Sequence, residues 1–350
     1  MQCHHCEEAA MKQRGLFDLE KRLWKIDKNG DPLIRINELT DWEMFRPALK
    51  KARGERRHPA GAKGYDVVVL FKTLILQSLY GLSDEATEFQ ILDRYSFGRF
   101  LGIEVGDKVP DATTIRLFRE DLKKAGIMDE LFSTFNASLQ EKGFQAMKGQ
   151  IVDASIVSAP KQRNSREENE QIKAGEVPDW PENKRRRKDT DARWTKKNGK
   201  SYFGYKNHIT VDVKHKVIRS YEVTDAAVHD SQVFEELLSE NTSRDVWADS
   251  AYRSAEKLKR LETLGYREHI QRKGNRGRAL TPRERAGNKT RSRIRSRVEH
   301  VFGIQAQRAG NFLVRTIGMA RARVKIGLRN LAYNIDRIAM LLMGQRENCA

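Results

Sequence analysis

The stretch Gln150-Ile-Val-Asp-Ala-Ser-Ile-Val-Ser158 marks the point at which the sequence changes from a helical to a strand-like pattern. Its isoleucine and valine residues are typical of a β-strand. Asp153 stands in the middle of this apolar run. A buried carboxylate is costly unless it is paired or binds a metal ion, whereas an aspartate on the solvent face of an alternating strand needs no partner. The stretch therefore predicts a strand that carries either a functional or a solvent-exposed acid.

The residues that follow predict a mixed α/β arrangement. Further strands are expected at 208–213, 217–223, 245–249 and 266–270. Helices are expected at 231–240, 254–264, 282–307 and 326–343. Strands and helices in this order form a mixed sheet with flanking helices. A polar insert at about 160–200, which contains Trp180 and Trp194, leaves the sheet between the first two strands.

The residues before this stretch predict helices. Val67, Leu70, Phe71 and Leu74 recur at spacings of three and four, and Gly81 ends the pattern. Further helices are expected to begin near residues 83, 111 and 128. The chain therefore divides into an N-terminal segment with a basic linker at 1–62, an all-helical domain at 63–146 and an α/β domain at 147–345.

Composition favours a nucleic-acid partner. The chain has 350 residues, with 66 Lys and Arg against 48 Asp and Glu, and a formal net charge of +18. An apolar share of 39% is too high for global disorder, and no apolar run is long enough to predict a membrane span. Cys3, Cys6 and Cys349 offer no disulfide framework, so a reducing cytosol is expected. So basic a chain is expected in the cytoplasm, associated with the nucleoid.

The positive charge is concentrated in residues 271–330, which hold 17 Lys and Arg but two acids, Glu284 and Glu299. Glu299 is expected to be ionised in this field. It is either the partner of Arg295 in a surface salt bridge or a metal ligand. The candidate phosphate contacts of this region are Arg291, Arg295, Arg297 and Arg308.

Two short clusters have a simpler alternative explanation. Lys184, Arg185, Arg186 and Arg187 are candidate DNA contacts, but they stand among eight acids and form only a solvated loop if they touch nothing. Zinc binding by the run Cys3-His4-His5-Cys6 is disfavoured, because four adjacent side chains cannot close one tetrahedron.

Three acids are candidates for metal-dependent chemistry. Asp249 ends the predicted strand at the carboxyl edge where α/β sheets bind ligands, and helix capping is the alternative role. Asp153, Asp249 and Glu299 come from two strands and a helix and could converge on two Mg²⁺ ions about 4 Å apart. Carboxylate oxygens suit Mg²⁺, for which Mn²⁺ can substitute, and no spaced Cys/His set competes with them. Such a site would cleave phosphodiesters.

Several motifs follow one another along the chain. In the α/β region they are Ile151-Val-Asp153-Ala-Ser, Tyr205-Lys-Asn-His-Ile-Thr-Val-Asp, Thr224-Asp-Ala-Ala-Val-His-Asp-Ser231, Val246-Trp-Ala-Asp249-Ser-Ala-Tyr252 and Arg295-Ser-Arg-Val-Glu299-His-Val-Phe-Gly303. Upstream they are Tyr80-Gly-Leu-Ser-Asp-Glu-Ala-Thr-Glu88, Asp93-Arg-Tyr-Ser-Phe97 and Pro110-Asp-Ala-Thr-Thr114. In this order the motifs resemble those of DDE transposases of bacterial insertion sequences, specifically the insertion-sequence-five group, and the resemblance covers about residues 40–343.

The resemblance implies a ribonuclease-H-like catalytic core preceded by a helical DNA-binding domain. It also implies that Asp153, Asp249 and Glu299 form the metal-binding catalytic triad and that Arg295 is the arginine one helical turn before the glutamate. Ser292 and Ala306 stand where the wider family has a tyrosine and a lysine. These departures concern the DNA contacts and leave the implied metal site intact. Three further residues match family positions without a clear role, namely His229, Asp230 and His300.

The implied activity is that of a transposase. Such an enzyme binds the terminal inverted repeats of its element as double-stranded DNA, cleaves with metal ions and joins 3′-hydroxyl ends to target DNA. Pairing two ends implies a homodimer, and no membrane partner is expected. The alternatives are a metal-dependent nuclease without joining activity and a non-catalytic DNA-binding derivative. Three candidate acids argue against the last, because a protein that only binds DNA does not need them.

Overall fold

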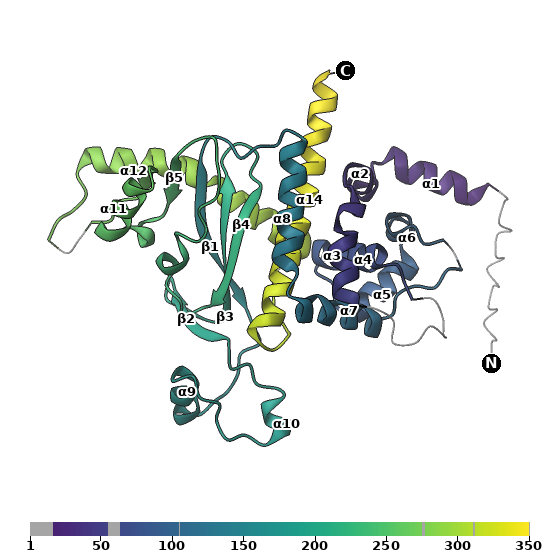
Figure 1. The fold of residues 1–350 in the computed structure, drawn as a ribbon, viewed down its shortest axis with the longest axis horizontal. Helices are drawn as coiled ribbons and strands as arrows, with labels where there is room; N and C mark the ends of the chain where they lie inside the picture. Colours follow the sequence, from purple (N-terminus) through teal and green to yellow (C-terminus); the bar gives the residue numbers. More distant parts are fainter. Residues whose placement is uncertain (1–16, 55–63, 105, 275–276, 311, 350) are drawn as a thin grey trace, which may run out of the picture.

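The computed structural model describes residues 17–54, 64–104, 106–274, 277–310 and 312–349, which form a helical part and an α/β part (Figure 1). The cluster Cys3–Cys6 lies outside these residues. The helical part contains α1 (Asp18–Lys28), α2 (Pro32–Leu39), the 3₁₀ helix η1 (Trp42–Phe45), α3 (Arg46–Arg53), α4 (Val67–Tyr80), α5 (Asp84–Asp93), α6 (Tyr95–Leu101), α7 (Ala112–Ala125) and α8 (Met128–Glu141). The predicted helical block is therefore present, and residues 18–53 add helices to it.

A six-stranded mixed sheet forms the α/β part. Its strands are β1 (Gln150–Ser158), β2 (Arg193–Lys197), β3 (Lys200–Asp212), β4 (Ile218–Asp225), β5 (Asp245–Ala248) and β6 (Arg267–Ile270). The order is β2-β3-β1-β5-β6, and β4 pairs with β3. β1 is antiparallel to β3 and parallel to β5. The predicted fold class, a mixed sheet with flanking helices after a helical region, is confirmed.

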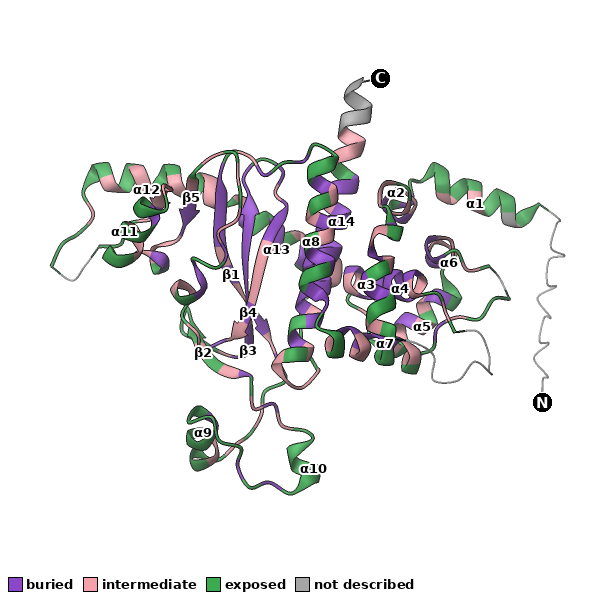
Figure 2. Ribbon diagram, viewed as in Figure 1, coloured by how far each residue is buried: buried purple, intermediate pink, exposed green. Residues whose placement is uncertain are grey.

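Helices cover both faces of the sheet. On one face, Val152 packs with Phe234, Leu237 and Leu261, the last from α11 (Ala255–Thr263). On the other face, Ile151 belongs to a large core shared with the helical part. That face is covered by α8, α13 (Arg297–Ala309) and α14 (Met319–Cys349). Figure 2 shows the buried residues of the strands and of α14 meeting in the middle of the molecule.

Helix α14 contacts both parts of the chain. It packs against β4 on one side and against α2, α4, α7 and α8 on the other. The buried side chain of Asn334 accepts a hydrogen bond from the Ile218 N–H at 2.9 Å and donates one to the Ile218 carbonyl at 2.8 Å. One turn earlier, the amides of Asn330 and Asn207 exchange two hydrogen bonds of 2.9 and 3.0 Å. These bonds fix the position of α14 on the sheet, because every polar group in them is buried.

Helix α4 lies at the centre of the helical part. Asp66 caps its first turn by accepting from the Val68 N–H, and Gly81 ends it in the left-handed conformation with φ +64°. A Cβ on Gly81 would lie 2.3 Å from the Ala309 carbonyl oxygen, so glycine also permits close contact with α13. Among the described residues, no single helix is long and apolar enough to cross a membrane, although α4 and α5 together, bent by 102°, meet the length and composition criteria.

The prediction of a helix at 231–240 is wrong. A 3₁₀ turn at Asp230–Val233 is followed by turns and extended chain. The Leu237 carbonyl accepts from the hydroxyl of Thr210 at 2.7 Å and from that of Ser220 at 2.6 Å, and the Ser239 N–H donates to Gln150. Hydrogen bonds to the sheet thus replace those that a helix would make here.

The long basic helix predicted at 282–307 is two helices, α12 (Pro282–Arg295) and α13, which meet at Ser296. The last predicted helix, at 326–343, is part of the longer α14. The polar insert contains α9 (Arg166–Lys173) and α10 (Glu182–Arg185) and projects away from the sheet (Figure 1).

The amide of Asn334 gives a test of how α14 is held. Replacing it as Asn334→Leu keeps a similar volume but leaves the buried N–H and carbonyl of Ile218 without partners, at roughly 1–3 kcal/mol each. We expect the free energy of unfolding to fall by about 2–4 kcal/mol in urea denaturation followed by tryptophan fluorescence. Asn183→Leu on exposed α10 is the matched control. Equal stability of the two variants would contradict this role of Asn334.

Candidate active site

Two of the predicted acids lie on neighbouring parallel strands. Gln150 and Ile151 of β1 pair with Val246 and Trp247 of β5, and continuing this register by two residues places Asp153 opposite Asp249. Asp249 directly follows β5, and its carboxylate accepts the Ala251 N–H at 2.8 Å. The capping role that the sequence left open for Asp249 therefore exists, at a short 3₁₀ turn (Ser250–Tyr252).

Arg295 joins the other two predicted acids. Its Nη1 lies 2.7 Å from Asp153 Oδ2, and its Nη2 lies 3.3 Å from Glu299 Oε1. The side chain of Asp153 is 16% exposed, whereas that of Glu299 is 63% exposed. The salt bridge expected between Arg295 and Glu299 is thus one arm of a bridge that continues to β1. Arg295 is the last residue of α12, and Glu299 lies in the first turn of α13. The ion pair between them therefore spans the break between the two helices at Ser296.

A cation beside Asp153 would stabilise its buried carboxylate. Burial, with a smaller contribution from the nearby Asp249 carboxylate, raises the pKa of Asp153 to about 6. The Arg295 guanidinium and the Ala154 N–H lower it, but they do not offset the loss of hydration. Near pH 7 this carboxylate is therefore mostly ionised in a position that costs free energy. A second cation beside it would relieve that cost.

The three carboxylates do not surround one point in this structure. Among the residues that the structure describes, no three Asp, Glu, His or Cys side chains approach closely enough to hold a metal ion. The guanidinium of Arg295 lies between Asp153 and Glu299 instead. The donor chemistry still fits Mg²⁺, since Asp153 and Asp249 offer hard oxygen ligands at one edge of the sheet. Glu299 joins them only if Arg295 leaves the carboxylates.

Polar side chains behind Asp153 were not predicted as site residues. Lys206 Nζ lies 2.8 Å from Asp230 and donates to the Val228 carbonyl at 2.6 Å. The hydroxyl of Tyr252 is buried and has no hydrogen-bond partner among the described residues. Burial raises the pKa of Tyr252 well above its usual value, and the carboxylates of Asp230, Asp153 and Asp249 raise it further. The signal was available, since both residues fall inside motifs of the resemblance.

Two of the family-matched histidines have simple surroundings. The ring Nδ1 of His229 accepts the Ser231 N–H at 3.3 Å and so caps the turn at Asp230–Val233. His300 is exposed on α13.

The comparisons with known proteins give the family of the chain. A family model described as "Transposase DDE domain" matches residues 145–335, which is more than half of the chain. The chain belongs to this transposase family. A second model, described as "Transposase domain (DUF772)", matches residues 21–121 in the helical part. The resemblance to DDE transposases is therefore confirmed, whereas membership of the insertion-sequence-five group stays a prediction.

One solved structure is also similar to this transposase. It is the cryo-EM structure of a piggyBac transposase synaptic complex with hairpin DNA, at 12% sequence identity and a TM-score of 0.46. The similarity covers 91% of this chain and 76% of the other.

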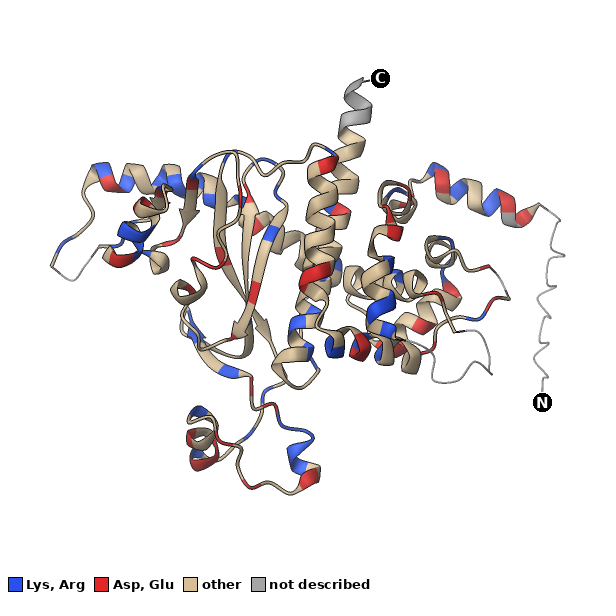
Figure 3. Cartoon of the chain, viewed as in Figure 1, with Lys and Arg blue, Asp and Glu red and all other residues tan. Residues whose placement is uncertain are grey.

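Several of the predicted DNA contacts already bind groups within the transposase. Arg297 donates to the Val213 carbonyl at 2.9 Å, and Arg308 pairs with buried Asp336 at 2.8 Å. Arg291 lies on α12, along which Figure 3 shows several Lys and Arg positions, and its Nε is buried with no hydrogen-bond partner among the described residues. Arg297 and Arg308 are therefore bound within the protein, whereas Arg291 Nε has no partner among the described residues, and all three stay predicted DNA contacts.

The basic side chains of the insert also divide into those that form ion pairs within the protein and those that do not. Lys184 forms an ion pair with Glu168, and Arg186 forms one with Glu182. Arg185 and Arg187 are exposed and form no ion pair with any described residue. Trp180 is 8% exposed and donates its indole N–H to Glu168, so it does not present a ring for stacking on a base. Trp194 is 43% exposed.

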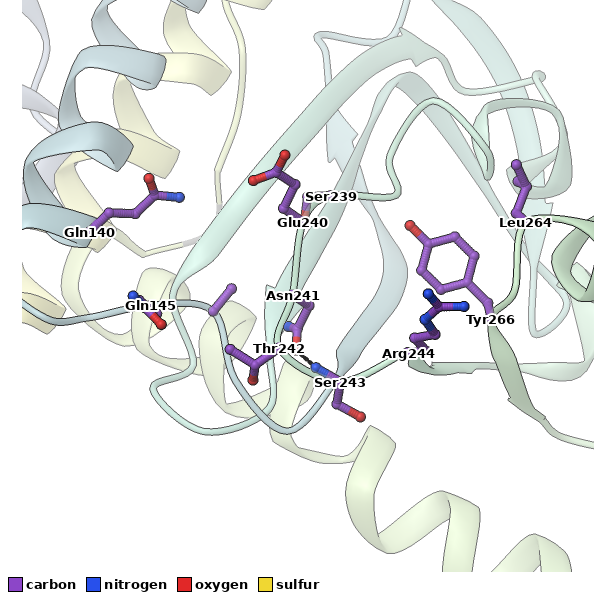
Figure 4. A pocket seen from close by; sticks show the side chains of 11 residues that line it. Gln140, Gln145, Ser239, Glu240, Asn241, Thr242, Ser243, Arg244, Leu264 and Tyr266 are labelled. Atoms are coloured by element: carbon purple, nitrogen blue, oxygen red, sulfur yellow. Dashed lines mark hydrogen bonds between the residues drawn. The ribbon is translucent and has the colours of Figure 1, made fainter.

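A polar hollow of about 620 Å³ lies at the other end of β1 and β5 (Figure 4). Its lining includes Gln140, Asn241, Arg244 and Tyr266, with Glu240 as its one acid. The lining residues Asn241 and Arg244 come before the start of β5, whereas Asp249 follows the end of that strand. It is therefore separate from the carboxylates.

His208, on strand β3, is expected to make the stability of the protein depend on pH. It is fully buried on β3, with Nε2 bonded to the Thr224 hydroxyl at 2.9 Å. Burial lowers the pKa of His208 to about 4, while Asp230 raises it and Lys206 lowers it. Because the unfolded chain binds a proton near pH 6.5 and the folded chain does not, His208 makes stability fall as pH drops from about 6.5 to 4.

We expect the variant His208→Gln to remove this contribution. Between pH 7 and pH 5 the wild-type protein should lose about 2 kcal/mol more unfolding free energy than the variant, measured by urea denaturation at each pH. Parallel losses in both proteins would show that other groups carry the pH dependence.

Proposed function

We propose that this transposase binds double-stranded DNA at the terminal inverted repeats of its insertion sequence, cleaves it in a metal-dependent reaction and joins the 3′-hydroxyl ends to target DNA. The observation that carries the proposal is the position of Asp153 opposite Asp249, just beyond the parallel pairing of β1 with β5 and within the matched DDE domain. Basic α12 and its Arg295 lie beside this pair, where DNA phosphates would be needed.

Asp153 and Asp249 would hold the metal, and Glu299 would complete the set once Arg295 withdraws. Two Mg²⁺ ions, or Mn²⁺ in their place, supply Lewis-acid stabilisation of the charge that develops on the phosphodiester oxygens. Arg295 keeps Asp153 paired before the metal binds and then has its donors free for a phosphate. Arg291 would position the DNA backbone from the same helix.

The functional units follow the proposed division of the chain. Residues 63–146 would be the DNA-binding domain, and residues 147–345, with the insert at 160–200, the catalytic domain. Helices α2 and α3, within the segment 1–62, share the apolar core of the helical unit. We further propose that two copies pair on two DNA ends and that the protein acts in the cytoplasm, associated with the nucleoid.

Cleavage of a labelled element end tests the proposal. Purified protein with Mg²⁺ should cut at the end of the element and, with a target plasmid, give strand-transfer products. Asp153→Ala should reduce cleavage roughly 100-fold or more, because the metal loses its buried ligand. Glu256→Ala on exposed α11 is the control. Cleavage without joining would identify a nuclease, and normal cleavage by Asp153→Ala would reject the site.

The arginines of α12 can be separated by two measurements. Arg295→Ala removes the partner of both Asp153 and Glu299, so it should reduce cleavage more than DNA affinity. Arg291→Ala should instead weaken DNA binding and flatten the plot of log affinity against log salt by about one unit. Glu299→Gln should abolish cleavage while affinity stays equal or rises. Normal cleavage by that variant would leave Glu299 as a salt-bridge partner alone.

A further inference from the structure

A basic hollow of about 1080 Å³ lies where the helical part, the insert and α14 meet. Side chains from α7, α10, residues 313–317 and the first turns of α14 line it. Seven of these side chains are basic and three are acidic. None of the three predicted catalytic acids lines it, so it is a separate feature of the surface.

Two of the three acids of the hollow are neutralised by part of the basic set, and the third, Glu85, is exposed and forms no ion pair with a described residue. Arg119 binds both carboxylate oxygens of Asp84, at 2.7 and 2.8 Å. Arg321 binds both oxygens of Glu120, at 2.6 and 3.0 Å. These bidentate pairs are internal and leave the remaining cations of the hollow in excess.

Four cations of the hollow have no anion. The side chains of Arg116, Arg185, Arg315 and Lys325 form no hydrogen bond or ion pair with any described residue. Lys325 is half-buried, and burial together with Arg119 and Arg315 lowers its pKa, against the effect of Asp84. The hydroxyl of Thr316, also in the lining, is buried and has no hydrogen-bond partner in the part of the chain that the structure describes. The hollow therefore has cationic donors and a hydroxyl for which the protein supplies no acceptor.

We propose that this hollow binds the phosphate backbone of the duplex DNA on which the transposase acts, so that the helical part, the insert and α14 hold one DNA segment away from the catalytic carboxylates. The inference rests on the proposed function and adds a DNA contact to it. Duplex DNA presents one negative charge per about 1.7 Å of its axis, which suits several cations from different elements. No aromatic side chain lines the hollow, which disfavours single strands, because these bind by stacking.

The test measures DNA affinity by fluorescence anisotropy of a labelled duplex element end with the full-length protein. The variant is Arg116→Ala/Arg315→Ala/Lys325→Ala. The charge-matched control removes three exposed lysines of α1, as Lys21→Ala/Lys25→Ala/Lys28→Ala. A second variant, Arg116→Lys/Arg315→Lys, keeps the charge of the hollow. Thermal unfolding of each protein verifies that it is folded.

Three lost phosphate contacts should flatten the salt dependence of log affinity by about three units. Between about 50 and 200 mM salt, the wild-type affinity should then fall about fortyfold more than that of the triple variant. The lysine variant and the α1 control should keep the wild-type slope.

An unchanged slope in the folded triple variant, or an equal change in the α1 control, overturns the proposal. So does a loss that affects a duplex RNA of the same length but not the DNA. Failure of the proposed function looks different, because the wild-type protein would then bind with the steep slope and still not cleave with Mg²⁺. Cleavage with an unchanged slope in the variant would instead reject the hollow alone.

Discussion

The docking of α14 on the sheet is the interaction on which the rest of the structure depends. The buried amides of Asn330 and Asn334 bond to β3 and β4, and the apolar residues of the same helix pack against the helical part. A single apolar core therefore runs from Leu33 through Ile151 to Ile338. The two parts of the chain cannot separate without exposing that core and leaving the amides unpaired. The position of the helical part relative to the carboxylates is fixed for this reason.

Around the carboxylates, one guanidinium occupies a place that a metal ion would also favour. Arg295 offsets part of the cost of burying Asp153 and draws Glu299 toward it. In the absence of a bound ion, Arg295 thus keeps the buried carboxylate of Asp153 paired. Under the proposed function, a metal ion held by all three acids would compete with Arg295, whose guanidinium lies between Asp153 and Glu299.

The sequence was informative where local pattern and chemistry agree. The β-branched run around Asp153, the acid after β5 and the capped helices were predictable, because each depends on residues that are close in the chain. The turn after Asp230 was not, since the Leu237 carbonyl is bound by hydroxyls from β3 and β4. The partner of Arg308, Asp336, lies on another helix, so charge counting along the sequence could not predict this ion pair.

The late position of α14 in the sequence has a consequence for synthesis. The helical part and all six strands emerge from the ribosome before α14 does, so the apolar faces that it covers stay open until then. Exposed faces of this kind make incomplete chains prone to aggregate. A chain that stops just before Met319 should therefore aggregate instead of accumulating as a shorter folded protein.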